Sequence, residues 1–203
     1  MVLKPETLRE RRKRELRQQL SDTATVMFME RGFDAVRVAD VARACGVTEK
    51  TVFNHFGSKE ALLADRWDTH VDALSARLAD TAPLEAALGV LDEELDFLLA
   101  SARRHGWAQV RRFGELVRTT PALVAHHRAA RDRLTEAAVE ALATRTGTTP
   151  DDPVVRITAA AVTGLWNVYA LSLQRHQSKG VVRVAREVRA DLARAAEVLR
   201  QGL

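Results

Sequence analysis

Residues Val38 to Phe56 read VADVARACGVTEKTVFNHF, and this stretch decides how the rest of the chain is interpreted. Apolar residues recur in its first half at three- and four-residue spacings, which predicts a short helix with one buried stripe: Val38, Val41, Ala42 and Cys45. Gly46 is expected to end this helix, because glycine readily adopts the left-handed conformation of a helix C-terminus. Thr48 then has the position of an N-cap, so a second helix is expected from about Glu49.

The second helix has one apolar face and one face rich in hydrogen-bonding groups. Val52 and Phe56 lie four residues apart and are expected to face the core. The remaining surface carries Glu49, Lys50, Thr51, Phe53, Asn54 and His55. A helix with such a polar face suits the major groove of DNA.

A longer segment around this unit, Met27 to Leu63, resembles the DNA-binding domain of TetR-family transcriptional repressors. The resemblance rests on the sequences FMERGF, VADVARACGV, TEKTVFNHF and SKEALL, which follow one another in the family's order and spacing. It implies a three-helix helix-turn-helix DNA-binding domain at residues 1–57. It also implies a helical ligand-binding and dimerisation domain at residues 58–203, and a partner in double-stranded operator DNA.

Three residues depart from the family's usual pattern. Phe53 stands where the family usually has a tyrosine whose hydroxyl binds a phosphate, and Lys50 replaces a small residue. Val36 occupies the usual position of a threonine, which leaves Arg37 as the substitute contact. Lys50, Thr51, Asn54 and His55 are expected to contact bases, with the phosphates held mainly by other residues. The complete expected DNA-binding set is Arg37, Thr48, Lys50, Thr51, Phe53, Asn54, His55 and Lys59.

Positive charge is concentrated at the start of the chain. The first 20 residues contain seven Lys or Arg and three Glu, whereas the remainder is balanced at 24 basic and 24 acidic residues. Such a run is often only a solvated helix face. Directly before a helix-turn-helix, it predicts contacts with DNA phosphates or with a minor groove.

Composition limits the class of protein. A chain of 203 residues with 46% hydrophobic residues is long enough for one large domain or two small ones with a real core. The single cysteine, Cys45, forms no intramolecular disulfide and is expected to be a small buried residue. The N-terminus is charged where a signal peptide needs an apolar segment, so a soluble, cytoplasmic protein without a membrane partner is expected.

The whole chain is expected to be all-α, with about nine helices. One helix should precede the helix-turn-helix, from about Pro5 or Thr7 to Arg31, and another should begin at Ser58 and continue to Leu78 as the mechanical link between the domains. The other expected helices are Leu84 to Leu98, Trp107 to Arg118, Thr120 to Thr144, Pro153 to Leu173 and Val184 to Leu199.

The segment from Val154 to Leu173 is apolar on nearly every side. Such a helix is either a membrane span or a helix buried on two sides, and Arg156 near its start favours the second interpretation. Because one monomer core does not use this much apolar surface, the segment predicts a homodimer joined by the last two helices.

Aromatic and aliphatic residues in the C-terminal helices suit an apolar cavity, although each alone is more often a core residue. The family resemblance implies that a small, largely apolar effector with an acyl or aromatic part binds there and releases the DNA. The candidate residues are Phe97, Trp107, Val110, Phe113, Val117, Leu123, Leu134, Trp166 and Tyr169, with Arg103 and His127 as polar anchors.

No catalytic or cofactor motif is present, so neither an enzyme nor a cofactor is expected. His126 and His127 are adjacent and point to different sides of a helix, which argues against a metal site. The alternative is a small helical enzyme or ligand carrier whose N-terminal similarity is incidental. A basic arm, a capped two-helix unit and Lys59 in series favour the DNA-binding protein.

Overall fold

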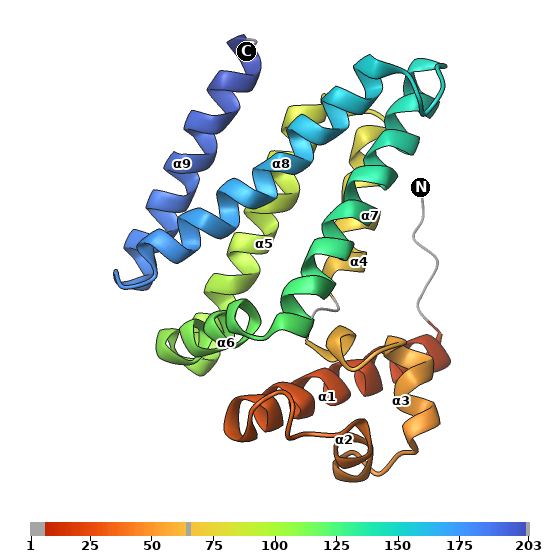
Figure 1. The fold of residues 1–203 in the computed structure, drawn as a ribbon, viewed down its shortest axis with the longest axis vertical. Helices are drawn as coiled ribbons and strands as arrows, with labels where there is room; N and C mark the ends of the chain where they lie inside the picture. The colour runs from red at the N-terminus through yellow and green to blue at the C-terminus, as the bar shows by residue number, and fades with distance from the viewer. Residues whose placement is uncertain (1–6, 64–65, 202–203) are drawn as a thin grey trace. The chain divides into compact units, whose positions relative to one another are not determined.

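The structure, a computed structural model, describes residues 7–63 and 66–201, and within these ranges all regular secondary structure is helical. It comprises nine α-helices and one 3-10 turn, η1 (Figure 1). The expected all-α class is therefore confirmed. The elements are α1 Leu8–Arg31, α2 Val38–Ala44, α3 Glu49–Phe56, η1 Glu60–Leu62, α4 Arg66–Leu78, α5 Pro83–His105, α6 Trp107–Thr119, α7 Pro121–Thr146, α8 Pro153–His176 and α9 Val181–Gln201.

Local capping interactions explain where several helices begin. At α1, the Thr7 hydroxyl accepts a hydrogen bond from the Glu10 amide at 3.2 Å, and the Glu10 carboxylate accepts one from the Thr7 amide at 2.8 Å. This reciprocal pair is a capping box, which satisfies two amides that a helix leaves unpaired. At α8, Asp152 caps the amide of Val154 at 2.8 Å, and Pro153 occupies the first helical position.

The chain forms two compact units. The N-terminal unit contains the described residues as far as Leu63 together with Phe113–His126. The C-terminal unit contains Arg66–Arg112 and the described residues from His127 to Gln201. Helices α6 and α7 therefore each contribute residues to both units.

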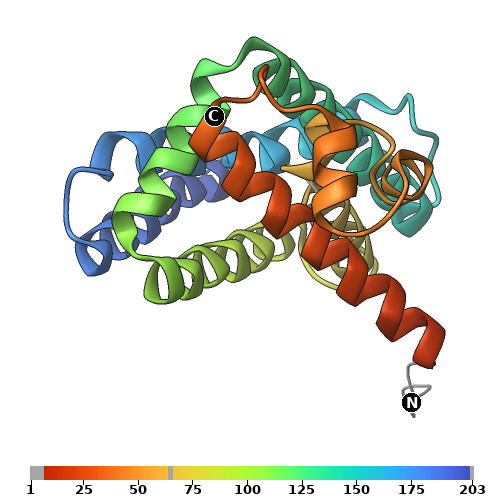
Figure 2. The same cartoon turned by 90° about the horizontal axis from the view of Figure 1, so that it is seen from below.

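The core of the N-terminal unit forms where α1 packs against α2 and η1 (Figure 2). Helix α1 contributes Leu20, Ala24 and Phe28, which recur at four-residue spacings and are buried. Phe33 anchors the connection to α2, with its ring centroid 5.0 Å from that of Phe28. The same cluster also takes in apolar residues from α2, α3, η1, α6 and α7: Val41, Val52, Phe56, Leu62, Phe113, Leu116, Val117 and Leu123.

The expected single helix from Ser58 to Leu78 is wrong at its start. Ser58 does cap the Ala61 amide, at 3.2 Å, but residues Glu60–Leu62 form a 3-10 turn and α4 begins at Arg66. The physical reason lies in Leu62 and Leu63, which are adjacent and both buried in the N-terminal unit. The Ser21 hydroxyl of α1 also donates to the Leu62 carbonyl at 2.9 Å, so contacts with a distant helix hold this turn in place and its shape does not follow from the local sequence.

The core of the C-terminal unit is built by α5, α8 and α9, with α4 packed against α5 and with part of α7. Helices α8 and α9 lie side by side and make the most extensive helix–helix contact (Figure 1). Buried residues of this core include Leu74, Leu91, Leu95, Leu134, Leu165, Trp166, Val188 and Leu192.

Helix α8 is apolar on both its buried and its exposed sides. Val155, Leu165 and Trp166 are buried in the C-terminal unit, whereas Ile157 and Leu171 are exposed. By length and composition alone α8 is a candidate membrane span, a test that core helices of globular proteins also pass.

Candidate nucleic-acid interface and a buried polar cluster

The turn between α2 and α3 is closed by backbone hydrogen bonds around Gly46. The Val47 amide donates to the Ala42 carbonyl at 2.9 Å, and the Gly46 amide donates to the Arg43 carbonyl at 3.2 Å. Gly46 has a φ of +69°, the left-handed conformation that this arrangement, a Schellman motif, requires. Val47 packs against the core of the N-terminal unit. The predicted glycine turn is therefore confirmed.

We expect Gly46→Ala to destabilise the N-terminal unit by about 1–2 kcal/mol, because a Cβ in the left-handed region meets the neighbouring backbone. No atom outside the turn lies within 4 Å of that Cβ, so the loss is backbone strain alone. The loss in the free energy of unfolding is measured by urea unfolding followed by circular dichroism. Gly114→Ala in α6 is the control, because its Cβ meets only the flexible end of Arg118 and a helical alanine is about 0.5–1 kcal/mol better than glycine. A Gly46→Ala protein as stable as the parent would contradict the need for a left-handed residue.

Helix α3 presents the polar face that its sequence predicts. The Thr48 hydroxyl accepts from the Thr51 amide at 3.2 Å and lies 2.9 Å from the Thr51 hydroxyl, so both side chains are held at the helix N-terminus. Val52 and Phe56 are buried, as expected. The exposed residues of the helix are Glu49, Lys50, Phe53 and Asn54.

His55 and Arg17 fix the C-terminal end of α3. Arg17 of α1 donates a hydrogen bond to the His55 carbonyl, and its guanidinium lies 4.3 Å from the centroid of the Phe56 ring. A cation at this position is favourable because it faces the negative end of the helix dipole. Burial lowers the pKa of the half-buried His55, with Lys13 and Arg17 adding to the effect, so this imidazole is neutral at pH 7.

The other residues expected to contact phosphates are Arg37, Lys59 and the basic residues of the N-terminal arm, and each has a different environment. Arg37 is exposed, and its amide donates to the Asp40 carboxylate at 3.0 Å, which holds the pKa of Asp40 below its usual value. Lys59 lies with its ammonium 4.3 Å from the Phe33 ring centroid, a cation–π contact. It stands beside the short turn η1 and not beside the long helix expected from the sequence. The basic residues from Arg9 to Arg17 belong to α1, whereas Lys4 lies outside the described residues.

A buried polar cluster joins three helices of the C-terminal unit. Arg66 Nε lies 2.6 Å from Glu94 Oε2, and His70 Nε2 lies 2.9 Å from the same oxygen. Trp166 Nε1 donates to His70 Nδ1 at 3.4 Å, so the proton of a neutral imidazole is assigned to Nε2, which donates to Glu94. We call Arg66, His70, Glu94 and Trp166 the Glu94 cluster, and Tyr169 follows Trp166 by three residues on α8.

The hydroxyl of Tyr169 is buried and has no hydrogen-bond partner among the described residues. Burial raises the pKa of Tyr169 well above its usual value of 10.0, Glu94 raises it further, and Arg66 opposes the rise.

Aromatic side chains surround the Glu94 cluster. Trp67 Nε1 donates to His127 Nδ1 at 2.6 Å, and its ring stands edge-on to His70 with 5.5 Å between the centroids. The guanidinium of Arg66 lies 3.6 Å from the centroid of Phe97. His127 and Phe97, both expected from the sequence, thus contact residues next to or within the cluster.

The expected effector-binding residues do not all belong to one unit. Phe97, His127 and Trp166 lie at or next to the Glu94 cluster, and Tyr169 is buried in the core of the C-terminal unit. Phe113, Val117 and Leu123 pack in the core of the N-terminal unit. The remaining residues lie elsewhere in the C-terminal unit: Leu134 in its core, Trp107 donating to the Gln177 carbonyl at 3.1 Å, half-buried Val110 and exposed Arg103.

Sequence reasoning missed Arg66, His70 and Glu94. A usable signal exists for two of them, because His70 stands four residues before the inward Leu74, and Glu94 stands three residues after the inward Leu91. A titratable residue on a buried apolar stripe needs a polar partner, which points to a polar site.

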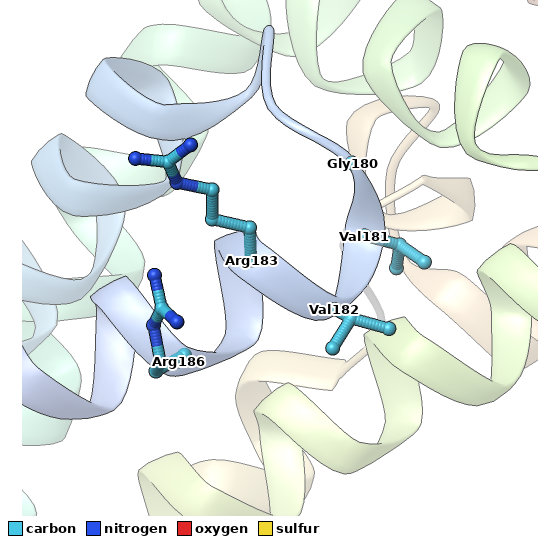
Figure 3. Close-up of a pocket in the computed structure, with 5 residues that line it drawn as sticks. All are labelled: Gly180, Val181, Val182, Arg183 and Arg186. Atoms are coloured by element: carbon cyan, nitrogen blue, oxygen red, sulfur yellow. The ribbon is translucent and has the colours of Figure 1, made fainter.

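Two surface hollows lie away from the Glu94 cluster. One is lined by Gly180, Val181, Val182, Arg183 and Arg186, and Figure 3 shows its two arginine side chains pointing away from its two valines. The other is lined by Thr135, Val139, Asp151, Pro153, Arg156, Ile157 and Ala160. None of the expected effector-binding residues lines either hollow. Among the residues that the structure describes, no three His, Cys, Asp or Glu side chains are grouped so that they could hold a metal ion.

Both parts of the sequence match known protein families. Residues 20–65 match the family described as bacterial regulatory proteins, tetR family, and residues 81–203 match the MftR C-terminal domain. The chain is 32% identical over 88 residues to the HTH-type transcriptional repressor KstR2 of Rhodococcus jostii, covering 39% of this chain and 43% of that protein. It is 29% identical over 157 residues to the HTH-type transcriptional regulator TcmR of Streptomyces glaucescens, covering 71% of this chain and 66% of that protein. The chain therefore matches less than two thirds of the length of either relative.

The fold resembles that of the SmeT–triclosan complex. The TM-score is 0.59 at 16% sequence identity, with 91% of each chain covered. At this level of identity the likeness concerns the fold alone.

Proposed function

The chain belongs to the TetR family of bacterial transcriptional regulators, and from this premise we propose that it is a repressor that binds a palindromic operator as a dimer and is released by a small apolar effector. In this proposal residues 1–57 bind DNA and residues 58–203 provide effector binding and dimerisation. The observation that carries it is the α2–α3 unit, in which a closed Gly46 turn and the Thr48 cap present the polar face of α3 to solvent.

The proposed reading face consists of Lys50, Thr51, Asn54 and His55. Support comes from the exposure of Lys50 and Asn54, which lie one helical turn apart on α3. The remaining contacts, to the DNA backbone, are assigned to Arg37, Thr48, Phe53 and Lys59. Because Phe53 has no hydroxyl, its contribution is apolar contact with the sugar–phosphate backbone.

We expect Lys50→Ala to lose about 1–3 kcal/mol of operator affinity and to change the ranking of single-base operator variants, because a lysine at a base edge discriminates between bases. Arg37→Ala is the matched comparison, since a phosphate contact weakens binding to all sequences alike and its loss lowers the salt slope by about one. Fluorescence anisotropy with promoter DNA at several salt concentrations measures both effects. If Lys50→Ala ranks the variants as the parent protein does, Lys50 reads no base.

The proposed dimer rests on an apolar stripe along the exposed side of α8. Val154, Ile157 and Leu171 are 69%, 65% and 60% exposed, respectively. Between them Ala161, Gly164 and Val168 continue the stripe at three- and four-residue spacings. A stripe of this kind suits pairing with a second copy around a two-fold axis, which would also present two α3 helices to successive major grooves.

The decisive experiment on the whole proposal is a gel shift with DNA from the protein's own promoter region, with a scrambled duplex of equal length as the control. Binding to the promoter alone supports the repressor. A protein that binds neither duplex at low salt favours the alternative of a helical carrier or enzyme. The named relatives argue against that alternative, since they are transcriptional regulators.

For the effector, we assign the polar part of the site to the Glu94 cluster. Helices α4, α5 and α8 each contribute a side chain to it, and Trp67 connects it to His127 of α7. An apolar site with a few converging polar groups is the usual composition of a small-molecule site.

A further inference from the structure

Helix α3 is fixed at its two ends by different parts of the chain. At its N-terminus the Thr48 hydroxyl accepts from the Thr51 amide, which is a local cap. At its C-terminus the cap is tertiary, because Arg17 of α1 donates a hydrogen bond to the His55 carbonyl. The last carbonyls of a helix have no partner within it, and a helix of eight residues is marginally stable by itself. The position of the last turn of α3 therefore depends on α1.

Arg17 differs from the other basic residues in the same part of α1. It is half-buried, and its guanidinium lies 4.3 Å from the centroid of the buried Phe56 ring, a cation–π contact. The basic residues that precede it on α1 are exposed: Arg9, Arg11, Arg12, Lys13 and Arg14. Arg17 thus contacts two consecutive residues of α3, whereas its basic neighbours are placed to meet solvent or DNA.

The two ends of α3 carry different residues of the proposed reading face. Lys50 lies in the first turn, beside Thr48, whereas Asn54 and His55 lie in the last turn. Lys50 and Asn54 are about 6 Å apart along the helix axis. A hydrogen bond to a base edge requires a separation of about 2.7–3.2 Å, so a shift of the last turn by about 1 Å is enough to break it. Such a shift displaces Asn54 and His55 more than Lys50.

We propose that Arg17 is a positioning residue for base reading: it holds the last turn of α3 against α1, so that Asn54 and His55 meet base edges, and it contacts no phosphate itself. The proposal rests on the proposed function, since an operator must exist to be read. The half-burial of Arg17 and its two contacts with α3 support it. A phosphate contact would act differently, because its loss weakens binding to all sequences alike and lowers the salt slope by about one.

Fluorescence anisotropy with single-base operator variants tests the proposal on the whole chain at about pH 8, where histidine is neutral. The Lys50→Ala and Asn54→Ala proteins first identify the base pairs that each end of α3 reads. Arg17→Ala should then lose at least about fivefold discrimination at the base pairs assigned to Asn54, the lower bound for one good base contact, and keep the discrimination at those of Lys50. Its salt slope should equal that of the parent protein. A uniform loss over all operator variants with a smaller salt slope would make Arg17 a phosphate contact and overturn the proposal.

Lys13→Ala is the matched control, because it removes an exposed cation of α1 one helical turn before Arg17. It should leave the ranking of the operator variants unchanged, whatever it does to the overall affinity. If Lys13→Ala changes the ranking as Arg17→Ala does, the effect is one of charge and the proposal is overturned. Arg17→Lys should restore part of the discrimination, since an ammonium also donates to a carbonyl and contacts an aromatic face.

The pKa of His55 gives a second readout that requires no DNA. Burial lowers this pKa, and Lys13 and Arg17 lower it further by repelling the imidazolium. Removing either cation should therefore raise the pKa of His55 toward the ordinary value of about 6.5, which an NMR titration of the imidazole protons measures. A raised pKa in both variants, with an altered base ranking in Arg17→Ala alone, assigns the ranking to position. An unchanged pKa of His55 in Arg17→Ala would contradict the contact and overturn the proposal.

The remaining outcomes separate this proposal from the proposed function. Circular dichroism checks that each variant is folded. If Arg17→Ala is unfolded, Arg17→Met takes its place, because a flexible apolar side chain fills the space beside Phe56 without the charge or the donor. An operator-binding parent whose base ranking is kept by the Arg17 variant refutes this proposal alone. A parent protein that binds no operator refutes the repressor and this proposal together.

Discussion

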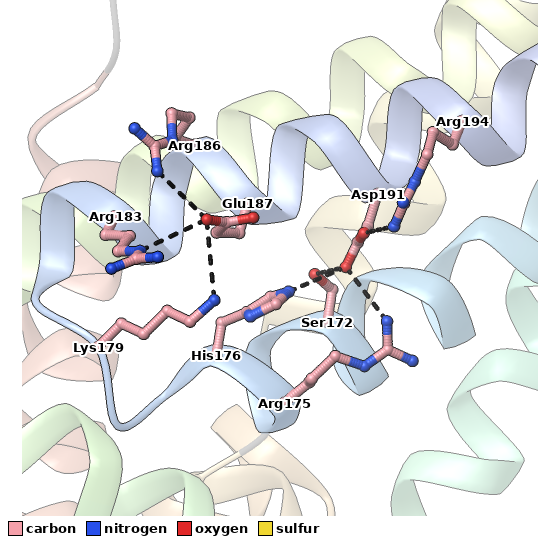
Figure 4. A network of polar contacts seen from close by, with 9 residues as sticks. All are labelled: Ser172, Arg175, His176, Lys179, Arg183, Arg186, Glu187, Asp191 and Arg194. Carbon is pink, nitrogen blue, oxygen red and sulfur yellow. Dashed lines mark hydrogen bonds and ion pairs between the residues drawn. The ribbon is translucent and has the colours of Figure 1, made fainter.

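Asp191→Ala is expected to lower the free energy of unfolding by about 3–5 kcal/mol, because it removes the acceptor of a buried network between α8 and α9. Asp191 Oδ2 accepts from the Ser172 hydroxyl at 2.6 Å and lies 3.2 Å from His176 Nε2 (Figure 4). Arg194 and Arg175 pair with the same carboxylate. Its removal leaves the buried Ser172 and His176 without their acceptor.

Glu187→Ala is the matched control on the same helix. Glu187 also contacts several cations, namely Lys179, Arg183 and Arg186 (Figure 4). Its side chain is 27% exposed, against 9% for Asp191, and solvent-exposed ion pairs contribute about 0–1 kcal/mol. Urea unfolding at pH 7 compares the two variants. Equal losses would show that burial does not distinguish these two carboxylates.

The difference in the free energy of unfolding between the parent protein and the Asp191→Ala variant should depend on pH. The Ser172 hydrogen bond lowers the pKa of Asp191 below its usual value, with His176 and Arg194 adding to the effect. A carboxyl with a depressed folded-state pKa contributes its full stability above the unfolded value of about 3.9 and loses it as pH falls through the folded value. The stability difference should therefore be constant from neutral pH down to about 5 and narrow below about 4.

Replacing both Ile157 and Leu171 by Glu is expected to convert the proposed dimer into a monomer. The two residues are exposed and lie on one side of α8, so each occurs twice in an interface around a two-fold axis. Burying unpaired carboxylates is strongly unfavourable, and the dimer dissociation constant should rise by at least about a thousandfold, equivalent to about 4 kcal/mol. Light scattering at micromolar concentration measures the mass. Operator affinity should fall with it, because a monomer contacts one half-site.

The control for this variant is Val26→Glu on α1, which adds the same charge at an exposed apolar residue of the N-terminal unit. It should keep the mass of the dimer. If the Ile157→Glu, Leu171→Glu protein is still a dimer while remaining folded by circular dichroism, α8 is not in the interface. The apolar stripe would then need another explanation.

Much of the helix-turn-helix could be predicted because its geometry is set by neighbours in sequence. Gly46 ends α2, Thr48 caps α3, and Val52 and Phe56 face the core through spacing alone. The same reasoning failed at Ser58. Its cap is present, but the helix it was expected to open is a short 3-10 turn, which is held against α1 by the burial of Leu62 and by the hydrogen bond from Ser21 to the Leu62 carbonyl.

The candidate effector site, in contrast, could hardly be predicted from the sequence, because distant residues form it. Trp166 and Tyr169 are recognisable as aromatic residues of an apolar helix, yet nothing local indicates that His70, 96 residues before Trp166, receives its indole hydrogen bond. Phe113 and Val117 lie four residues apart, a spacing that fits a helix face lining a pocket as well as one packed in a core. In the structure they pack in the core of the N-terminal unit.

The sequence by itself determined the helices, their caps and the polar face of α3, because these follow from interactions within about one helical turn. Only the tertiary structure decided which polar groups meet. Arg17 reaches the end of α3 across 38 residues, and Glu94 gathers Arg66 and His70 from another helix. The physical reason is that a buried charge or hydroxyl requires a partner, while its sequence position does not specify which distant residue the packing of the helices brings within hydrogen-bonding distance.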